Sequence, residues 1–342
     1  MLKTPSPRLL AVAAIVAFAA GCAGNSSSSA SSQSSSFVPF SHQIGSAFRV
    51  LPGPIVAGPM IVPVVPHHSS VPVGWPAKKK KQQILFVAAN SASEILMYDP
   101  KTPNPSPEGK ITTGIDYPVG LAVDKSGTLY VANIENSSIT IYPAGASSPS
   151  LTITTGLSSP YGIAVDSSGD IFASNLGTNA VVGYKAGATS PYETISFSSL
   201  GQPVGVGVDG ENNVWVACDS TNAVYEIPAG SSTPQNSELA DLNGPIGISF
   251  GKKDVIYVSN FGADPSNVAI YTYGTTSPSG KITDGIEQNG PTLNGFTKSG
   301  AFFQSNQADN VVGYKKGQTT YFSTISGVSN PLGIASSPLV KK

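Results

Sequence analysis

Short runs of alternating apolar and polar residues fill the chain from residue 84 onward. Residues 129–133 (Leu-Tyr-Val-Ala-Asn) and 139–142 (Ile-Thr-Ile-Tyr) are two such runs, and turn-forming residues bound them. Successive side chains of a strand point to opposite faces of its sheet, so a period of two predicts β-strands rather than helices. This part of the chain is therefore expected to be an all-β structure of short strands joined by turns.

The strand pattern repeats at intervals of about 42 residues. A typical repeat opens with Pro-x-Gly, continues with an apolar run that often ends in Asp, and then carries further runs; the repeat from Pro291 is a more degenerate copy. The opening prolines are Pro118, Pro160, Pro203, Pro245 and Pro291, spaced by 42, 43, 42 and 46 residues. Four strands fit into one repeat, and four-stranded repeats of this length are typical of the blades of a β-propeller.

The two ends of the repeat array are complementary. The first unit lacks an opening strand and starts with the run at 84–90, whereas the chain ends with an unpaired opening strand at 331–335. Pairing these runs completes a sixth blade and leaves no long strand edge exposed. Residues 72–74 (Pro-Val-Gly) are a competing source of the same inner strand. The prediction is a six-bladed β-propeller over residues 84–342, closed by the C-terminal strand pairing with the N-terminal blade.

The sequence of the repeats resembles the NHL repeat family. The resemblance rests on Pro-x-Gly-Ile-Ala-Val-Asp, followed by Ile-Tyr-Val-Ala-Asn and Ile-x-Ile-Tyr. The likeness extends over residues 84–337 and implies the propeller fold. It implies little about activity, because propellers carry many unrelated functions. The chain departs from the common NHL pattern by having Asn where Asp often ends the second strand, and by lacking the arginines usual near the third.

The N-terminus has the layout of an export signal. Lys3 and Arg8 precede an apolar run at 9–20, which is shorter than the ~20 residues that a membrane-spanning helix needs. The sequence Ala-Ala-Gly-Cys22 resembles the lipobox of bacterial lipoproteins, which implies a lipoprotein-type signal peptide over 1–21 and lipidation of Cys22. An ordinary signal peptide with an incidental cysteine is the alternative. Ala rather than Asp follows Cys22, so the protein is expected to be exported and lipid-anchored at the bacterial outer membrane or cell surface.

Residues 22–83 join this signal to the repeats. Their first part is nearly all serine, and the remainder is rich in Pro, Val and Gly. Such a segment cannot bury enough apolar surface to fold, so 22–83 is predicted to be a disordered tether. His67 and His68 lie in it. Adjacent histidines can bind a metal, but a solvated linker is the simpler interpretation.

Composition and residue types disfavour several classes of function. Charged residues make up 11% of the chain and the net charge is −1, so nothing indicates nucleic-acid binding. Two cysteines give no disulfide framework, and Cys218 is expected to be a small buried side chain. All three histidines precede residue 84, so the propeller offers no Ser/His/Asp triad. Propeller lyases that open streptogramin antibiotics have similar repeat wording but depend on a histidine base, so that activity is disfavoured.

Charged residues separate between the two faces of the predicted ring. If the strands of a blade are lettered A to D from the axis outward, the D–A and B–C connections meet on one face, here called the top. The bottom face collects the A–B and C–D turns and, with the neighbouring strand ends, the lysines from Lys101 onward. The top connections contain no lysine or arginine and nine acids: Glu94, Asp116, Glu135, Asp219, Asp241, Asp264, Asp284, Glu287 and Asp309.

A ligand site is predicted on the top face, around the mouth of the central channel. The residues that end the B strands should approach this mouth, and amide and carboxylate oxygens suit a cation or a sugar. The alternative is that each Asn caps its own turn. The candidate site residues are Asn90, Asn133, Asn175, Asp219, Asn260 and Asn306, with the acids Asp116, Asp241, Asp264 and Asp284.

Two functions are consistent with these residues. The first is a non-catalytic, monomeric binding or scaffold module at the cell envelope, whose partner is an envelope protein or a cationic or sugar-like ligand. It needs no cofactor beyond a possible divalent cation such as calcium. The second rests on a resemblance to the gluconolactonase and regucalcin group of propellers, which implies a metal-dependent lactonase with ligands from Asn133, Asn175, Asp219 and Asn260. The tether should enter at the bottom face and turn its lysines toward the membrane.

Overall fold

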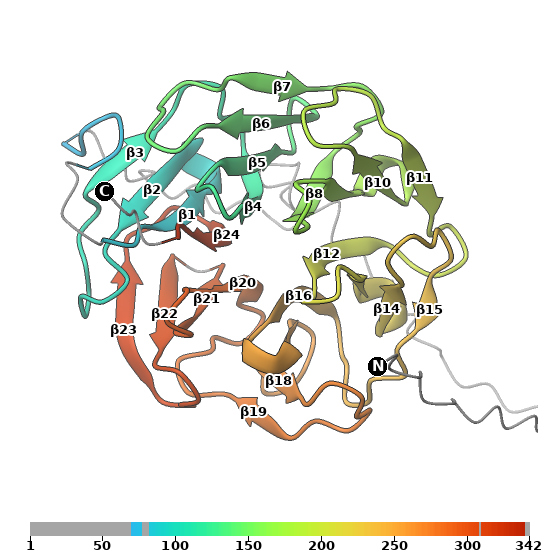
Figure 1. Cartoon of the computed structure of the whole chain (residues 1–342). Coiled ribbons are helices and arrows are strands. Elements are labelled where there is room, and N and C mark those ends of the chain that lie inside the picture. Colours follow the sequence, from blue (N-terminus) through green and yellow to red (C-terminus); the bar gives the residue numbers. More distant parts are fainter. Residues whose placement is uncertain (1–69, 77–81, 308, 339–342) are drawn as a thin grey trace, which may run out of the picture. The chain divides into compact units, whose positions relative to one another are not determined.

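The computed structural model describes residues 70–76, 82–307 and 309–338. Within these residues, 24 strands form six four-stranded antiparallel sheets arranged around a central axis (Figure 1). Each sheet is one blade; in five of the six the first strand along the chain is the innermost, and in the sixth the last strand of the chain is the innermost. The predicted all-β, six-bladed β-propeller is therefore confirmed.

The blades follow one another along the chain, each written here from its inner to its outer strand. Blade 1 contains β4 (Pro118–Val123), β5 (Leu129–Asn133), β6 (Ser138–Tyr142) and β7 (Leu151–Ile153). Blade 2 contains β8 (Pro160–Val165), β9 (Ile171–Asn175), β10 (Ala180–Tyr184) and β11 (Glu193–Ser196). Blade 3 contains β12 (Pro203–Val208), β13 (Val214–Cys218), β14 (Ala223–Ile227) and β15 (Gln235–Asn236).

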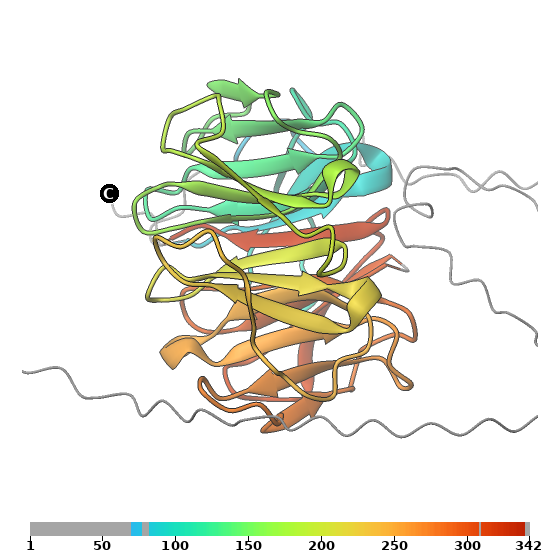
Figure 2. The ribbon, with the colours of Figure 1, turned by 90° about the vertical axis from the view of Figure 1, so that its right-hand side faces the viewer.

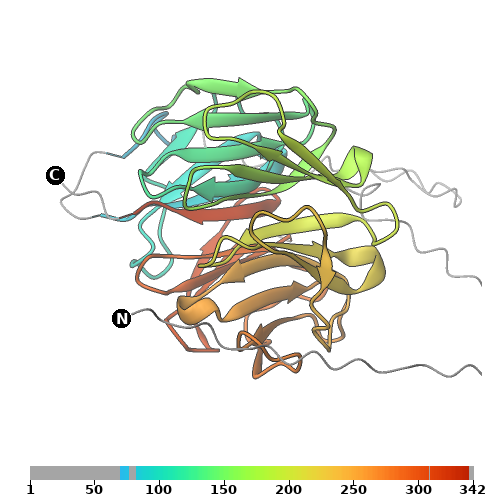
Figure 3. The ribbon, with the colours of Figure 1, turned by 45° about the vertical axis from the view of Figure 1, so that its right-hand side comes forward.

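The second half of the ring has the same organisation. Blade 4 contains β16 (Pro245–Phe250), β17 (Ile256–Asn260), β18 (Asn267–Tyr271) and β19 (Gly280–Ile282). Blade 5 contains β20 (Pro291–Phe296), β21 (Phe302–Asn306), β22 (Asn310–Tyr314) and β23 (Tyr321–Ser326). Blade 6 contains β24 (Pro331–Ser336), β1 (Leu85–Ala89), β2 (Glu94–Tyr98) and β3 (Gly109–Ile111). The 3-10 helices η1 (Asn90–Ala92), η2 (Leu176–Thr178) and η3 (Asp219–Thr221) lie on one side of the ring and η4 (Lys252–Asp254) on the other (Figure 2 and Figure 3).

The C-terminal strand closes the ring. β24 pairs antiparallel with β1, with Leu85 opposite Ser336 and Val87 opposite Ile334. The inner strand of blade 6 therefore comes from the end of the chain, and the competing assignment of residues 72–74 to that strand is excluded. Because β24 and β1 come from opposite ends of the repeat array, their pairing completes the sixth blade and closes the ring.

Residues 70–76 instead pack against the outside of blade 6. The N–H of Gly74 donates to the carbonyl of Lys110 on β3 at 2.7 Å. The indole N–H of Trp75 donates to the carbonyl of Ala146 in blade 1, also at 2.7 Å. This piece of the predicted tether thus belongs to the propeller, because the indole and the strand edge supply buried contacts that a serine-rich segment lacks.

The Pro-x-Gly openings are explained by how closely the inner strands approach each other. A Cβ atom built on Gly120 would lie 2.3 Å from the carbonyl oxygen of Tyr161, and one on Gly162 would lie 2.4 Å from that of Val204. Real Cβ atoms do not come so close to backbone oxygens, so any other residue would push neighbouring blades apart. The glycine of the motif is therefore a packing requirement between these blades, whereas blade 5 carries Leu293 at this position.

The second strands are buried on both faces. All five residues of β5 are buried, including Tyr130 and Asn133, although the sequence alternates between apolar and polar side chains. Stacking of the blades explains this, because each sheet is covered by its neighbours on both sides. Polar residues of these strands must therefore find their hydrogen-bond partners inside the protein.

The Asp that ends the inner strand caps the turn that follows. Oδ1 of Asp124 accepts the N–H groups of Ser126 at 2.8 Å and Thr128 at 2.9 Å. Asp166 makes the same pair of bonds in blade 2. These carboxylates are used within their own turns on the bottom face, while the lysines there extend outward.

Candidate ligand-binding site at the mouth of the channel

Each blade is entered by a loop from the outer strand of the preceding blade, here called the incoming loop. In blade 1, Oδ1 of Asn133 accepts the N–H of Asp116 at 3.0 Å, and its Nδ2 donates to the carbonyl of Gly114 at 3.3 Å. The hydroxyl of Tyr142 donates to the carbonyl of Thr113 at 2.8 Å. One buried amide and one buried phenol thus clamp the incoming loop against the blade.

The same clamp occurs in blades 2, 4 and 5. The amide oxygens accept N–H groups of the incoming loops: Asn175 from Ser158 (2.6 Å), Asn260 from Asn243 (3.2 Å) and Asn306 from Glu287 (3.4 Å). The matching phenols, which donate to carbonyls of the same loops, are Tyr184, Tyr271 and Tyr314. The four clamp amides are at most 1% exposed. Their observed role is to hold the incoming loops, and in this structure they do not face solvent.

Blade 3 replaces the clamp with apolar contacts. Cys218 stands at the register position of the amide and Ile227 at that of the phenol. Phe197, from the incoming loop, is fully buried in the same apolar cluster and lies edge-on to Tyr225 with ring centroids 5.8 Å apart. Cys218 is buried as predicted, and burial raises the pKa of its thiol.

Strand register separates Asn90 and Asp219 from the clamp residues. Pro331 lies opposite Ala89 and Pro203 lies opposite Cys218, so Asn90 and Asp219 come one residue after the clamp position. The prediction that Asn90 is equivalent to Asn133 was therefore wrong by one residue. We call the six residues that directly follow the B strands the mouth residues: Asn90, Ile134, Leu176, Asp219, Phe261 and Gln307.

An apolar plug lies beneath the mouth residues. It takes one buried side chain from each of the six inner strands: Val119, Tyr161, Val204, Ile246, Leu293 and Leu332. A single cluster with a member from every inner strand must lie on the axis of the ring. Ile134, Leu176 and Phe261 pack against this plug. The mouth is thus a partly apolar ring above a closed floor.

Asp219 is the acidic member of the mouth ring. Its Oδ1 is buried and has no hydrogen-bond partner in the described part of the chain. Burial raises the pKa of this carboxyl, and the N–H groups of Ser220 and of Asp219 itself offset part of that shift. Burial, followed by the negative charge of Asp219, also raises the pKa of Tyr161 in the plug. The carboxylate therefore lies close to the plug, partly removed from water.

Asn90 lies in the mouth ring but is engaged within the protein. Its Nδ2 donates to the carbonyl of Pro118 at 3.2 Å, and its Oδ1 accepts the side-chain amide of Asn330 at 3.1 Å. The first contact joins blade 6 to the inner strand of blade 1, and the second joins it to its own incoming loop. Asn90 therefore fixes the mouth opposite Asp219 across the ring.

The remaining predicted site acids are spread over the top connections. Asp241 lies 3.6 Å from Lys281 on the outer strand β19, and Asp284 accepts the N–H of Tyr321 on the outer strand β23 at 3.2 Å. Asp264 is exposed, and Asp116 is half-buried in the incoming loop of blade 1. The structure thus brings Asp219 to the axis, while Asp241 and Asp284 reach the rim.

Exposed charge differs between the faces. Glu135, Asp264 and Asp309 are exposed on the top connections. The bottom turns expose several lysines: Lys125, Lys252, Lys253, Lys298, Lys315 and Lys316. Glu94, counted among the top acids, is buried and paired with Lys110 at 3.1 Å.

The channel below the plug is narrow and mostly apolar. Its cavity of about 30 Å³ is lined by residues of the inner strands such as Leu121, Ile163 and Val206. That volume holds a water molecule or two and nothing larger. In the described ranges no three His, Cys, Asp or Glu side chains are grouped in a way that could hold a metal ion. The same ranges contain no helix with the length and apolar character needed to cross a membrane.

Comparison with known proteins agrees with the blade structure. Residues 116–142 match the model of the NHL repeat. This segment spans β4, β5 and β6 of blade 1, including the clamp residues Asn133 and Tyr142. The predicted likeness to the NHL repeat is confirmed for this blade, and the predicted six-bladed propeller is confirmed by the fold. Among curated proteins, none matches the sequence.

Several solved structures share the fold at low sequence identity. A crystal structure of a nidogen/laminin complex includes a chain with 15% identity and a TM-score of 0.63, covering 75% of this chain and 98% of that one. A protein of unknown function from Bacteroides caccae has 9% identity and a TM-score of 0.60, covering 75% and 99%. Virginiamycin B lyase from Staphylococcus aureus has 12% identity and a TM-score of 0.54, covering 80% and 96%. At such identities the likeness establishes the fold alone.

Proposed function

We propose that this propeller is a non-catalytic binding module that holds a cationic group of its ligand against Asp219 at the mouth. The supporting observation is a carboxylate oxygen, Oδ1 of Asp219, that is buried beside the plug without a hydrogen-bond partner in the described residues. Keeping a carboxylate from water without a partner costs free energy. A ligand cation would remove that cost, so binding and charge neutralisation are coupled.

The neighbours of Asp219 favour a cation carried on an apolar stem. Leu176 and Phe261 flank it around the mouth ring, and Tyr161 lies below in the plug. Apolar side chains suit the methylene stem of a lysine or arginine, and aromatic faces attract ammonium and guanidinium groups. A basic side chain of an envelope protein is therefore the proposed ligand. The exposed acids Glu135, Asp264 and Asp309 would draw it toward this face.

Nα-acetyl-arginine methyl ester is a suitable probe, with Nα-acetyl-citrulline methyl ester as its uncharged counterpart. We expect the arginine compound to raise the melting temperature of the protein and the citrulline compound to leave it unchanged. Asp219→Asn should abolish the shift, because the amide offers no charge. Asp264→Asn, an exposed acid on the same face, should retain it. An arginine-dependent shift that survives in Asp219→Asn, or none in the wild type, would contradict the proposal.

The Asp219→Asn variant also has a predicted effect on stability. Because burial raises the pKa of Asp219 in the folded state, the ionised carboxylate destabilises the fold at neutral pH. Stability from this group is complete below its unfolded value of 3.8 and is lost as pH rises through the folded pKa. Asp219→Asn should therefore melt at a higher temperature than the wild type at pH 7, and the difference should vanish below pH 3.8.

The alternative function, a metal-dependent lactonase, can be tested on the same purified protein. Asn133, Asn175 and Asn260, three of its four proposed ligands, already bind their incoming loops. Metal analysis of the purified protein, followed by calcium titration, separates the alternatives. A stoichiometric, tightly held divalent ion with lactonase activity would overturn the binding module.

We also propose that the protein is exported and anchored through lipidated Cys22 at the bacterial outer membrane or cell surface, as a monomer. Cys22 and the signal-like segment lie outside the described residues. The export layout of the sequence and the exposed bottom lysines support this arrangement, since lysines favour anionic lipid surfaces. Cys22→Ser should move the protein from the membrane fraction to the soluble fraction, whereas Cys218→Ser should not.

A further inference from the structure

The outer strand of blade 5 differs from the other outer strands. β23 has six residues, whereas β3, β7, β11, β15 and β19 have two to four. It is the last strand of its sheet, and no strand of the described chain pairs with its outer edge. Long free edges present unpaired N–H and C=O groups that another extended segment can join.

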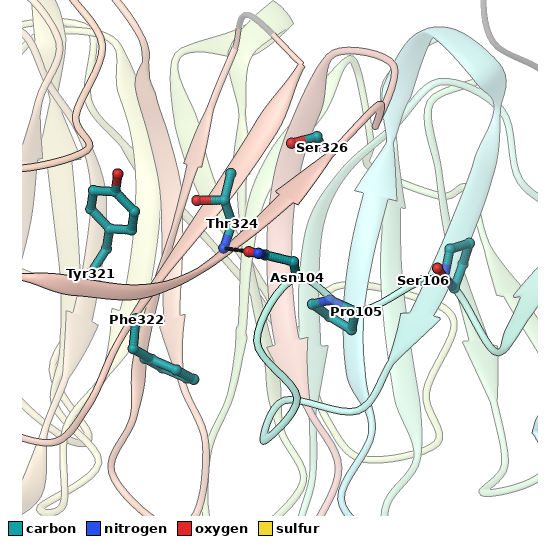
Figure 4. Close-up of a pocket in the computed structure, with 8 residues that line it drawn as sticks. Asn104, Pro105, Ser106, Tyr321, Phe322, Thr324 and Ser326 are labelled. Carbon is teal, nitrogen blue, oxygen red and sulfur yellow. Dashed lines mark hydrogen bonds between the residues drawn. The ribbon is translucent and has the colours of Figure 1, made fainter.

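A groove runs between this edge and the connection 99–108 of blade 6. Its volume is about 640 Å³. Tyr321, Phe322, Thr324 and Ser326 line one wall, and residues 104–107 (Asn-Pro-Ser-Pro) line the other (Figure 4). This space suits several residues of an extended peptide.

The backbone of β23 offers hydrogen bonds to the groove. The N–H of Gly327 points inward, to the carbonyl of Asp309 at 3.1 Å. Alternation along the regular part of the strand then directs the backbone groups of Thr324 and Ser326 outward. The N–H of Thr324 donates to Oδ1 of Asn104 at 2.9 Å, so a side-chain amide takes the place of one backbone carbonyl of a missing strand (Figure 4).

The chain itself shows that a blade edge of this protein accepts an extended segment. On blade 6, Lys110 of β3 donates its N–H to the carbonyl of Pro72 at 3.0 Å and accepts the N–H of Gly74 at 2.7 Å. Trp75 follows and packs edge-on against Phe86 with centroids 5.2 Å apart. A short extended segment that contains proline and is followed by an aromatic anchor thus pairs with part of the neighbouring edge.

The side chains of the groove favour the same kind of occupant. Tyr321 is 45% exposed, and Lys315 lies 5.8 Å from the ring of Phe322. Pro105 and Pro107 line the same groove as Tyr321 and Phe322. Aromatic and proline surfaces bind extended, proline-containing peptides, which lose little conformational entropy on binding.

We propose that the free edge of β23 binds an extended, proline-containing segment of a partner protein as a fifth strand, which displaces the side chain of Asn104 from Thr324. This site is separate from the mouth and does not depend on the cation-binding proposal. Its partner is recognised mainly through backbone hydrogen bonds, with an apolar side chain against Tyr321 and Phe322.

The test uses dodecapeptides selected from a displayed random library on the full chain. Enriched peptides should contain proline, and the most enriched one, labelled with fluorescein, should bind by anisotropy. Ser326→Pro should weaken its binding about tenfold or more, because the ring removes an outward N–H without touching the bonds to β22. Ser196→Pro is the matched control: Ser196 lies opposite Ala180 on β11 as Ser326 lies opposite Asn310 on β23.

Three outcomes would overturn the proposal. They are a lack of enriched peptides, equal binding by wild type and Ser326→Pro, and equal weakening by Ser326→Pro and Ser196→Pro. Amide hydrogen exchange identifies the occupant. The N–H of Ser326 should exchange rapidly in the free protein and slowly with peptide. Slow exchange in the free protein at all concentrations would mean that the chain covers its own edge, and concentration-dependent protection would indicate a second copy.

Discussion

Blades 1 and 3 hold the same element, the incoming loop, with different side chains at the clamp positions; in blade 3 the polar contacts to the loop come instead from Ser220 and Thr221 of η3. In blade 1, Asn133 and Tyr142 bind the loop through buried hydrogen bonds. In blade 3, Cys218 and Ile227 stand at these positions, and Phe197 of the incoming loop is buried in the same apolar cluster. All members change together, because a buried polar group without its partner costs more than an apolar contact in its place.

The comparison teaches that in these two blades the clamp positions differ as a set of contacts rather than as single residues. Blade 6 differs from both, because Ala89 stands at the register position of the amide and Tyr98 at that of the phenol. A single mismatched side chain should still lower the stability of a blade whose other clamp contacts are all polar or all apolar.

The largest effect is expected from Asn260→Ala in blade 4. It removes the partner of the N–H of Asn243 and of the carbonyl of Asp241, and it leaves a cavity. We expect a loss of about 3 kcal/mol in the free energy of unfolding, measured by urea denaturation. Cys218→Ala, at the same register in blade 3, should cost only about 1 kcal/mol. Equal losses would show that the clamp bonds are not what distinguishes these blades.

A smaller loss is expected from converting blade 3 toward the polar type. Cys218→Asn would place an amide against Phe197 and Ile227, where the apolar contacts offer it no loop partner like that of Asn133. The cost should be about 2 kcal/mol by urea denaturation. Cys218→Val, an apolar side chain in the same place, should cost less than the amide. A more stable Asn variant would refute the comparison.

Tyr184→Phe in blade 2 should cost about 1 kcal/mol, because it removes one buried hydrogen bond to the carbonyl of Thr155. Burial raises the pKa of Tyr184 to about 12. Since the folded state favours the neutral phenol, this stability is complete below pH 10, its ordinary value, and is lost as pH rises through 12. Urea denaturation at pH 8 and pH 11 should show a smaller alkaline loss in Tyr184→Phe than in the wild type. Tyr117→Phe, an exposed phenol, should change neither value.

The smallest effect is expected at Cys218, whose thiol should not react with a disulfide reagent in the native protein. Burial, and then the charge of Asp219, raises its pKa, so the thiol stays protonated at neutral pH. In a Cys22→Ser background, an aromatic disulfide reagent at pH 8 should leave the native protein unmodified for hours and modify it within minutes in urea. Rapid reaction of the native protein would mean that the apolar clamp of blade 3 opens readily.

Much of the ring could be predicted from the sequence because its repeats are local. The Pro-x-Gly opening, the Asp that caps the turn and the alternating runs recur at similar spacing, and each acts within a blade or between adjacent blades. The spacing also placed the closing strand correctly, because the array began and ended with complementary parts. The packing of Trp75 between blades 6 and 1 could not be predicted in this way, because residue 75 lies outside the repeats.

The candidate site could be predicted less well. Asn90 looked like Asn133 because both end an apolar run, but the pairing of β1 with β24 puts Ala89 in that position. Asp219 was predicted among ten site residues, and only the geometry separates it from the clamp amides. Whether an amide faces a loop or the solvent depends on neighbouring blades that the local sequence does not describe.

The periodicity of the chain was sufficient to specify short strands, four to a blade and six blades to a ring, since strand alternation and turn chemistry are local properties. Closure of the ring then decided everything that involves more than one blade. It buried the second strands on both faces, assembled the plug from six separate strands, and left one carboxylate at its rim. Those features arise from long-range packing, in which the partner of a side chain is set by the arrangement of the blades rather than by its neighbours along the chain.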